Sequence, residues 1–504
     1  MASDITTAAQ APARGATPNL FLTVFPSIML PMFLAALDQT IVATALPAIA
    51  ASLGEVERVS WIVVSYLVAN TIAAPVYGRL GDAIGRKRMM FVALFVFVAA
   101  SILCALSGSI LALTAARLLQ GAGGGGLMTL SQALIAESVP PRQRGRYQGY
   151  LSGMYASAAT FGPVAGGYLT QHWGWHSVFL VNLPLGLLAA LLVLRLPAHP
   201  STAHPSTRGP IRFDVWGTIL FAGFIAPILL AMEQAQRFTP EVLPAVAALL
   251  AAAALSLVLL VRQERRARAP LLPIQLFRQA GIWRTDTLAA CVAGQTVSLV
   301  SFLPMYLQVV RHAGTAHSGV LLLPLTLGVA LGSLCCGRII AATGRTAILP
   351  SVGLAVSATM LLSLAAFAPH LANGTIIAML ALASACTGTA MPVVQMTVQT
   401  VAGPRFLGAA AASVQFSRSV GASFGTALVG AVLFAVLAAR DPHAAAMFAA
   451  LLEQGPRALD ALPAAQRGII AAEVADAFRA AFLTIGCFTT TAMLFAWWLP
   501  VRRI

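Results

Sequence analysis

The sequence predicts an all-helical protein that crosses a membrane many times. Of its 504 residues, 59% are hydrophobic and only 9% are charged, and the mean hydropathy is +0.84. A soluble globular domain carries roughly 25% charged residues, so a chain this apolar would not stay dissolved in water. Stretches of about 20 mainly apolar residues, the length of a helix that crosses the bilayer core, recur along the whole chain.

Fourteen of these stretches are expected to span the membrane. They cover residues 20–47, 60–78, 89–107, 110–137, 148–170, 177–196, 214–234, 242–262, 285–310, 317–341, 347–368, 374–398, 407–437 and 478–500. Residues 1–19 are polar and lack the pattern of a cleavable signal, so the first span is expected to act as the insertion signal. The polar stretch before it is then a cytoplasmic tail.

The distribution of basic residues fixes the expected orientation. The chain has 31 basic and 16 acidic residues. With the N-terminus in the cytoplasm, the inner connections and termini hold roughly three times as many basic residues as the outer ones, as the positive-inside rule requires. An odd number of spans would reverse the second half, so fourteen spans with both termini cytoplasmic fit best. The excess of basic residues is therefore explained by membrane topology, and no nucleic-acid partner is expected.

Several functional classes are disfavoured by missing residue patterns. The single lysine, Lys87, is followed by Arg88 and not by Ser or Thr, so the chain has no phosphate-binding GxxxxGK[ST] loop and ATP is not its own energy source. The six cysteines lie in apolar runs without metal-ligand spacing, so no metal site and no cofactor are expected. The spans contain no cluster of His, Asp and Glu, which argues against an enzyme.

Two segments of the chain are repeated. Residues 78–86 (GRLGDAIGR) and 337–345 (GRIIAATGR) agree at five of nine positions, with Ala341 in place of Asp82. Residues 128–167 also match 391–430 at a constant offset, and this match pairs Gly145 with Gly408. The repeats lie at equivalent topological positions, which indicates a duplication of six-span halves. Parallel halves of this kind are a transporter architecture, with the substrate site between them near mid-membrane.

The duplication predicts the domain organisation. The expected units are a cytoplasmic tail at 1–19, a six-helix bundle at 20–196, a cytoplasmic linker at 197–213, two inserted membrane helices at 214–262, a basic cytoplasmic connection at 263–284, and a second six-helix bundle at 285–500 that includes an extracytoplasmic segment at 438–477.

Four motifs lie in this frame and carry a resemblance to a known family. They are Gly78–Lys87 (GRLGDAIGRK) between spans two and three, RLLQG from Arg117 in span four, GPVAGG at 162–167 in span five, and LDQTIV from Leu37 in span one. With these motifs the chain resembles the major facilitator superfamily, in particular its fourteen-span drug:proton antiporters. The resemblance implies a major facilitator fold of two six-helix bundles plus two inserted helices.

The resemblance also implies a function. It points to multidrug efflux driven by proton antiport across the inner membrane of a bacterium, and thereby to antibiotic resistance. The glycine motif at 162–167 is associated with antiporters and not with uptake symporters. A proton-coupled uptake symporter, or an exporter of one specific metabolite on the same fold, is the alternative.

Asp38 is the only acidic residue that falls well inside an expected span. An ionised carboxylate there costs about 2.5–3.5 kcal/mol, so such residues usually face a cavity and mark an ion pathway. Asp38 lies roughly 13 Å from the outer end of span one and Arg117 roughly 10 Å from that of span four, so the two can share a depth. We expect Asp38 to be the proton-coupling carboxylate and Arg117 to tune it. The alternative is a fixed structural ion pair, or an aspartate bonded to local backbone.

The loop between spans two and three is expected to form a cytoplasmic gate made of Gly78, Asp82, Gly85, Arg86 and Lys87. The two glycines allow close approach of helix ends, and Asp82 is expected to cap a helix or to accept from an arginine of a neighbouring inner loop. The alternative is a solvated turn whose charges serve only the positive-inside rule.

Span five carries the antiporter motif, with Gly162, Pro163, Gly166 and Gly167. Pro163 removes a backbone donor and is expected to kink the helix. The glycine face is expected to meet span thirteen and to seal the cavity against proton leak. The alternative is ordinary tight helix packing, the commonest role of a GxxxG pair in a membrane.

Polar side chains in apolar spans are the candidates for lining a substrate cavity. The alternative for each is a structural hydrogen bond to a neighbouring helix. They are Tyr66, Asn70, Gln120, Gln295, Gln308, Gln395, Gln415 and Arg418. One deep acid in so apolar a chain favours a lipophilic or cationic substrate over a sugar. The expected partners are a small-molecule substrate, protons and the lipid bilayer, with the protein working as a monomer. The sequence leaves open whether a periplasmic adaptor is used.

Overall fold

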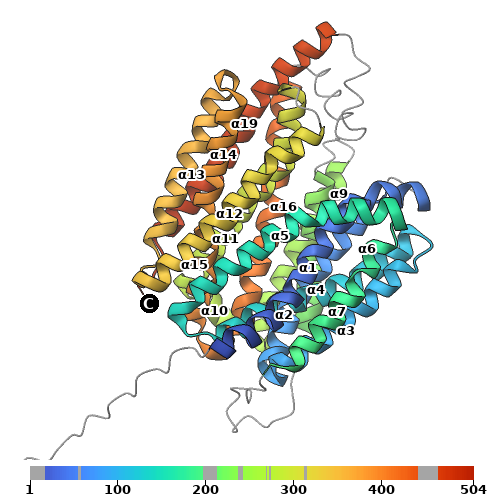
Figure 1. Cartoon of the computed structure of the whole chain (residues 1–504), viewed down its shortest axis with the longest axis vertical. Helices are drawn as coiled ribbons and strands as arrows, with labels where there is room; N and C mark the ends of the chain where they lie inside the picture. The colour runs from blue at the N-terminus through green and yellow to red at the C-terminus, as the bar shows by residue number, and fades with distance from the viewer. Residues whose placement is uncertain are drawn as a thin grey trace, which may run out of the picture.

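The computed structural model describes residues 18–54, 58–196, 213–235, 242–267, 270–271, 274–311, 315–440 and 464–503, and Figure 1 shows their arrangement. Within these residues every named element is a helix, and the one isolated β-bridge joins Arg345 to Arg503. The predicted all-helical fold is therefore confirmed. In a bilayer this follows from the need of each backbone polar group for a partner inside its own segment.

The N-terminal bundle contains five long helices and a sixth that is interrupted. They are α1 (Pro18–Leu53), α2 (Ser60–Ile84), α3 (Arg86–Ala105), α4 (Ile110–Ser138), α5 (Pro141–Trp173), α6 (Ser177–Leu180) and α7 (Asn182–Leu194). A single residue, Gly85, joins α2 to α3 with a φ of +112°. Only glycine adopts this conformation without strain, so Gly85 is needed for the turn. A side chain there would meet open space, so the expected close approach of helix ends at Gly85 is wrong.

The C-terminal bundle repeats this plan. Its elements are α10 (Ile274–Phe277), α11 (Ala280–Met305), η4 (Tyr306–Val310), α12 (Thr315–Thr343), α13 (Ile348–Phe367), η5 (Ala368–His370), α14 (Asn373–Gly388), α15 (Ala390–Ala402), η6 (Pro404–Phe406), α16 (Leu407–Arg440) and α19 (Ala464–Trp497). Gly344, the counterpart of Gly85 in the repeat, also has a positive φ, of +67°. The backbone thus reproduces the duplication that the sequence shows.

Two helices stand between the bundles in sequence and beside them in space. They are α8 (Val215–Ala235) and α9 (Leu243–Arg266). Phe221 of α8 packs against Phe416 of α16, with ring centroids 5.7 Å apart, and shares an apolar cluster with Val68 of α2. Most of α9 is exposed in the absence of lipid. The inserted pair therefore contacts both bundles while lying at the periphery.

Twelve helices in the described part of the chain are long and apolar enough to cross a membrane. Helices α4 and α5 fall outside this set, although they occupy the ranges expected for spans four and five. Arg117, Gln120 and five glycines make α4 less apolar, and basic residues open α5. Most of the α4 side chains are nonetheless buried within the bundle. A multi-pass membrane protein is confirmed, and the count of fourteen crossings stays a prediction.

The two bundles meet most closely at one end, which carries the connections at residues 84–86, 139–141, 344–347 and 403–406 and is called the loop end below (Figure 1). There Gly78 of α2 faces Gly408 of α16, so that a methyl group on Gly78 would lie 2.6 Å from the Gly408 carbonyl oxygen. Gly145 of α5 faces Gly337 of α12 in the same way. Because the repeat pairs Gly78 with Gly337 and Gly145 with Gly408, the two contacts are related by the symmetry of the duplication.

Several predicted units lie outside the described residues. These are most of the tail, the linker apart from residue 213, and residues 441–463 of the expected extracytoplasmic segment. The predicted domain boundaries stay predictions.

The close contact between α5 and α12 leads to a cross-linking prediction. Ser152 Oγ of α5 lies 2.6 Å from Ser333 Oγ of α12. With the six native cysteines replaced and a protease site inserted between the bundles, Ser152→Cys combined with Ser333→Cys is expected to form a disulfide on mild oxidation. Cleaved molecules would then stay joined on a non-reducing gel.

The control pairs Ser152→Cys with Thr343→Cys, which lies ten residues further along α12 and thus about 15 Å away along the helix. This pair is expected to separate after cleavage. Separation of the Ser152→Cys and Ser333→Cys pair as well would contradict the closed contact between the bundles.

Candidate functional site

Asp38 and Arg117 form an ion pair inside the N-terminal bundle. Arg117 Nη1 of α4 lies 2.5 Å from Asp38 Oδ2 of α1, and the two side chains are 1% and 0% exposed. The two residues, which the sequence predicts to lie at a common depth in the membrane, are therefore in direct contact. Since an unpaired charge at this depth would be strongly unfavourable, the pair explains how both residues are accommodated.

Amide side chains complete the surroundings of the pair. Gln120 Nε2 and Asn182 Nδ2 each donate to Asp38 Oδ1 at 2.8 Å. Arg117 Nη1 also donates to Gln120 Oε1 at 2.8 Å, and the guanidinium stands 4.2 Å from the centre of the Tyr66 ring. Both carboxylate oxygens thus accept from a donor, as a buried charge requires. We call Asp38, Arg117, Gln120, Asn182 and Tyr66 the ion-pair cluster.

The glycines of α4 make this cluster possible. Asn70 and Tyr66 of α2 lie directly against α4, so that side chains at Gly121 and Gly125 would overlap the carbonyl oxygens of Tyr66 and Asn70. Backbone contact between α2 and α4 lets the Arg117 side chain, which also donates from Nε to the Ile62 carbonyl at 3.3 Å, reach α1. Small residues at such interfaces are the usual means of close helix packing in membranes.

Asn182 belongs to the cluster, although sequence reasoning gave it no role. It is the first residue of α7, directly after the short helix α6. The available signal was an amide side chain within the apolar stretch 177–196. Nothing in its spacing shows that it reaches Asp38, because 144 residues separate the two.

A cavity of about 250 Å³ lies between the bundles, beside the ion-pair cluster. Its lining comes from α1, α5, α11, α12, α14, α15 and α16 and includes Ala36, Gln39, Thr40, Ser152, Tyr155, Ala156, Ala158, Ala159, Gln295, Thr296, Leu299, Val300, Leu325, Thr326, Val329, Ser384, Thr387, Met391 and Arg418. Ala36, Gln39 and Thr40 flank Asp38 on α1. The carboxylate itself faces away from the cavity into the bundle.

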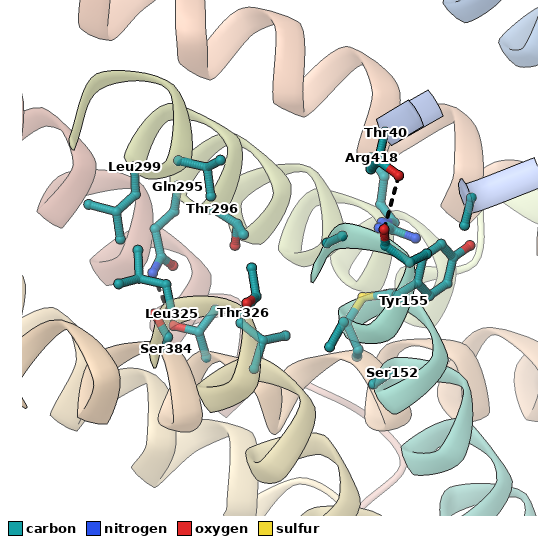
Figure 2. Close-up of a pocket in the computed structure, with 18 of the residues that line it drawn as sticks. Thr40, Ser152, Tyr155, Gln295, Thr296, Leu299, Leu325, Thr326, Ser384 and Arg418 are labelled. Atoms are coloured by element: carbon teal, nitrogen blue, oxygen red, sulfur yellow. Dashed lines mark hydrogen bonds between the residues drawn. The ribbon is translucent and has the colours of Figure 1, made fainter. Parts of the chain in front are cut away.

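Figure 2 shows how the polar lining is distributed. Arg418, Tyr155 and Thr40 lie at one side of the cavity, and Gln295, Leu299 and Ser384 at the other. Arg418 stands 5.9 Å from the centre of the Tyr155 ring. Gln295 donates from Nε2 to Thr387 Oγ1 at 3.0 Å. The cavity therefore has a cationic side and an amide side, joined by apolar and hydroxyl-bearing walls.

Two of the eight candidate cavity residues, Gln295 and Arg418, are in the described lining. Tyr66 and Gln120 face the ion pair instead, because the close packing of α2 on α4 turns them inward. Asn70 is buried between the same two helices. Gln308 lies in η4, Gln395 in α15 and Gln415 in α16, and none of the three belongs to the described lining.

The predicted gate residues meet at the loop end. Arg86 donates to Asp82 Oδ1 from Nη2 and to Glu137 Oε2 from Nη1, both at 2.7 Å. Asp82 also accepts from the backbone N–H of Gly408, at 3.2 Å, across the boundary between the bundles. Of the two expected roles, capping a helix is observed at α16, whereas no arginine of a neighbouring loop donates to Asp82 among the described residues. Asp82 is bound instead by Arg86 of its own loop, four residues away, and by the first turn of α16.

Lys87 and Glu137 complete this region. The Lys87 ammonium donates to the carbonyl oxygens of Leu194, at 2.9 Å, and Leu196, at 2.5 Å, at the end of α7. A cation at a helix C-terminus satisfies carbonyls that have no partner in the helix. Glu137 lies 51 residues from Arg86 in the sequence, and only the fold brings the two side chains together.

The glycine motif of α5 packs against α1. A side chain at Gly162 or Gly166 would overlap the hydroxyl of Thr40 or Thr44, and Thr40 Oγ1 donates to the Ala158 carbonyl at 3.0 Å. The expected contact with span thirteen is wrong, because the motif face of α5 is covered by its own bundle. Gly167 meets open space, and Pro163 is accommodated within an otherwise continuous helix.

These features define a class of protein. Two helical bundles enclose a central cavity, a closed contact seals one end, and the helices suit a membrane. Among the described residues no group of three or more His, Cys, Asp and Glu side chains could hold a metal ion. The architecture of two bundles around a cavity is that of a membrane transporter for small molecules.

Comparison with known proteins agrees with this class. The family profile described as Major Facilitator Superfamily matches residues 28–426. An uncharacterised MFS-type transporter of Mycobacterium tuberculosis is 33% identical over 478 residues, which are 94% of this chain and 68% of the relative. The multidrug transporter protein MdtP of Bacillus subtilis is 28% identical over 409 residues, 81% of this chain and 74% of that protein.

A solved structure shares the fold. The human organic anion transporter MFSD10 superposes with a TM-score of 0.65 at 15% identity, over 95% of this chain and all of that one. The chain belongs to the major facilitator superfamily. The expected resemblance to this superfamily is thus confirmed, whereas the fourteen-span drug:proton antiporter branch stays a prediction.

The burial of the ion pair leads to a stability prediction. Removing one partner of a buried pair leaves an uncompensated charge and costs about 3–5 kcal/mol. Arg117→Ala is therefore expected to lower the free energy of unfolding by that amount, measured by reversible unfolding in mixed micelles. Replacing both Asp38 and Arg117 by alanine is expected to cost less than the sum of the two single changes.

The matched control is the exposed pair of Arg440 and Asp476, whose side chains are 51% and 39% exposed. Arg440→Ala is expected to cost at most about 1 kcal/mol, because solvent screens an exposed pair. If Arg117→Ala and Arg440→Ala lowered the free energy of unfolding equally, burial would not increase the contribution of the Asp38–Arg117 pair to stability.

Proposed function

We propose that the protein exports lipophilic small molecules from a bacterial cell by alternating access, in exchange for protons. Asp38 is the proton-coupling carboxylate in this proposal, and Arg117 sets its proton affinity. The protein works as a monomer in the cytoplasmic membrane, with both termini in the cytoplasm. The asymmetric distribution of arginines and the bacterial relatives support this location.

The observation that carries the proposal is the position of the ion pair beside the cavity wall. Asp38 is bound by Arg117, Gln120 and Asn182, while Gln39 and Thr40, the next two residues of α1, line the cavity. Protonation of Asp38 would remove the charge that holds Arg117 and would change this packing. Thr40 would pass the change on, because it contacts both the cavity and α5.

The energetics favour such a coupling. Movement of one proton into the cell is favourable by about 2.3 kcal/mol per 100 mV of membrane potential, before any pH gradient is added. Binding that proton requires a group that is neutral in one state and charged in another. A buried carboxylate that can gain or lose a guanidinium partner meets this requirement, since an opposite charge favours the ionised form.

The closed loop end supports alternating access. In this state Asp82, Gly78 and Gly145 of the N-terminal bundle contact the C-terminal bundle at the loop end. In this proposal they form the gate that opens in a second state. A ligand can shift such an equilibrium only if it binds the two states differently. Protonation of Asp38 and occupation of the cavity by substrate would act in opposite directions on this contact.

Two features support export of lipophilic compounds. The cavity walls contain Leu299, Val300, Leu325 and Val329 beside the hydroxyl groups, a lining typical of sites for apolar ligands. A relative that is 28% identical over 409 residues bears the name multidrug transporter. A proton-coupled uptake symporter, or an exporter of one metabolite, is the competing function on the same fold.

The test uses inverted membrane vesicles that are energised so that their interior becomes acidic. The wild-type protein is expected to accumulate a neutral lipophilic fluorescent dye inside these vesicles, and an uncoupler should abolish the accumulation. Asp38→Asn is expected to reduce accumulation to the level of vesicles without transporter. Exchange of the dye down its own gradient should persist, because the amide keeps the shape of the carboxyl group.

Asp476→Asn is the matched control, because Asp476 also pairs with an arginine but at the surface. It is expected to leave proton-driven accumulation unchanged. Full accumulation by the Asp38→Asn variant would refute the coupling role. A symporter would instead expel the dye from vesicles with an acidic interior, since both solutes would move outward together.

A further inference from the structure

We propose that the substrate of the central cavity is an amphipathic anion, with an acidic group at Arg418 and a hydrogen-bond donor at Gln295. This assignment rests on the proposed export function, because it names the substrate class of that same cavity. It also departs from the cationic part of the expected lipophilic or cationic substrate, which came from one deep acid in so apolar a chain.

The charge of the described cavity lining carries the first step. Arg418 is the one charged side chain among the described lining residues, and the remaining polar groups there are hydroxyls and amides. Asp38 cannot supply a negative charge to the cavity, because its carboxylate is 0% exposed and is neutralised by Arg117. A cationic ligand would therefore meet a like charge with no carboxylate facing it, which is unfavourable in a medium of low polarity.

The second step concerns the hydrogen-bonding capacity of Arg418. A guanidinium carries five N–H donors. The Tyr155 side chain, whose ring centre lies 5.9 Å from the guanidinium, offers at most one phenolic oxygen as an acceptor. No carboxylate pairs with Arg418 anywhere in the stretches that the structure describes. A planar donor set of this kind is suited to a carboxylate, sulfonate or phosphate group.

The other side of the cavity offers an acceptor. Thr387 Oγ1 donates to the Ala383 carbonyl at 2.9 Å, so the Gln295 atom that contacts Thr387 is the amide nitrogen. The Gln295 carbonyl oxygen is then left buried without a partner among the described residues. Leaving a buried acceptor unsatisfied is costly, and a hydroxyl or N–H group of the substrate would remove that cost.

Together these groups describe the ligand. Arg418 and Gln295 lie at opposite sides of the cavity in Figure 2, with Thr296 and Thr326 between them. The lining also contains apolar side chains such as Leu299, Leu325 and Val329. A ligand that meets both groups has an apolar body, an acidic group at one end and a donor at the other. Exchange of one such monoanion for one proton would move two charges in the same electrical direction, so the membrane potential would drive export strongly.

The test measures equilibrium binding to the purified full-length protein in detergent at neutral pH. The probes are 4′-hydroxybiphenyl-4-carboxylate, the same biphenyl with a trimethylammonium group in place of the carboxylate, and the neutral analogue with a hydroxymethyl group. The anion is expected to bind most tightly. Arg418→Gln is expected to weaken anion binding about 10- to 100-fold, the value of a charge-assisted hydrogen bond, and to leave binding of the neutral probe nearly unchanged.

Arg146→Gln is the matched control, because Arg146 also stands over a tyrosine ring, at 5.7 Å, but is exposed and far from the cavity lining. It is expected to change no affinity. Arg418→Lys keeps the charge and is expected to retain part of the anion preference, which makes the test informative if Arg418→Gln does not fold. Gln295→Leu is expected to weaken the hydroxylated anion more than the same anion without its hydroxyl group.

Two results would overturn the inference. The first is binding of the cationic probe as tightly as the anion, and the second is anion binding that is unchanged in both Arg418 variants. If either of these binding results is obtained while neutral dyes are exported in vesicles, the proposed function stands and the anion assignment fails. If the anion binds through Arg418 but no probe of any charge is transported, the assignment stands while the proposed function fails.

Discussion

A charge within a membrane protein must find its partners inside the protein, and the N-terminal bundle is arranged around this constraint. Asp38 and Arg117 come from helices that are far apart in sequence, and both carboxylate oxygens accept hydrogen bonds from side chains of α4 and α7. To bring Arg117 to α1, α4 packs backbone against backbone on α2, which requires glycine at Gly121 and Gly125. The polar cluster and the glycine-rich sequence of α4 are thus two consequences of the same requirement.

The duplication acts at a second place, the closed contact between the bundles. Gly78 contacts Gly408, which is the counterpart of Gly145 in the second repeat. Gly145 contacts Gly337, which is the counterpart of Gly78. The contact is nonetheless asymmetric in charge, because Asp82 binds the first turn of α16 whereas its counterpart in the second repeat is Ala341.

The cavity and the ion pair are separate but adjacent. The carboxylate of Asp38 points into the bundle, and the neighbouring Gln39 and Thr40 point toward the cavity. In the proposed function, Asp38 and the cavity would therefore influence each other through the position of α1, without direct contact. The one charged side chain in the described cavity lining is Arg418, which comes from the other bundle.

Sequence alone determined the helical class, the superfamily and the duplication, because apolar length, loop motifs and repeated glycines depend on local order along the chain. It also indicated Asp38 and Arg117, since charges are rare in apolar spans. Only the tertiary structure decided which helix faces which: the Gly162 motif packs on α1 and not on span thirteen, Tyr66 and Gln120 turn toward the ion pair, and Asn182 and Glu137 gain partners. The physical reason is that a helix buried on several sides has no single polar stripe, so the pattern of residues does not reveal its orientation.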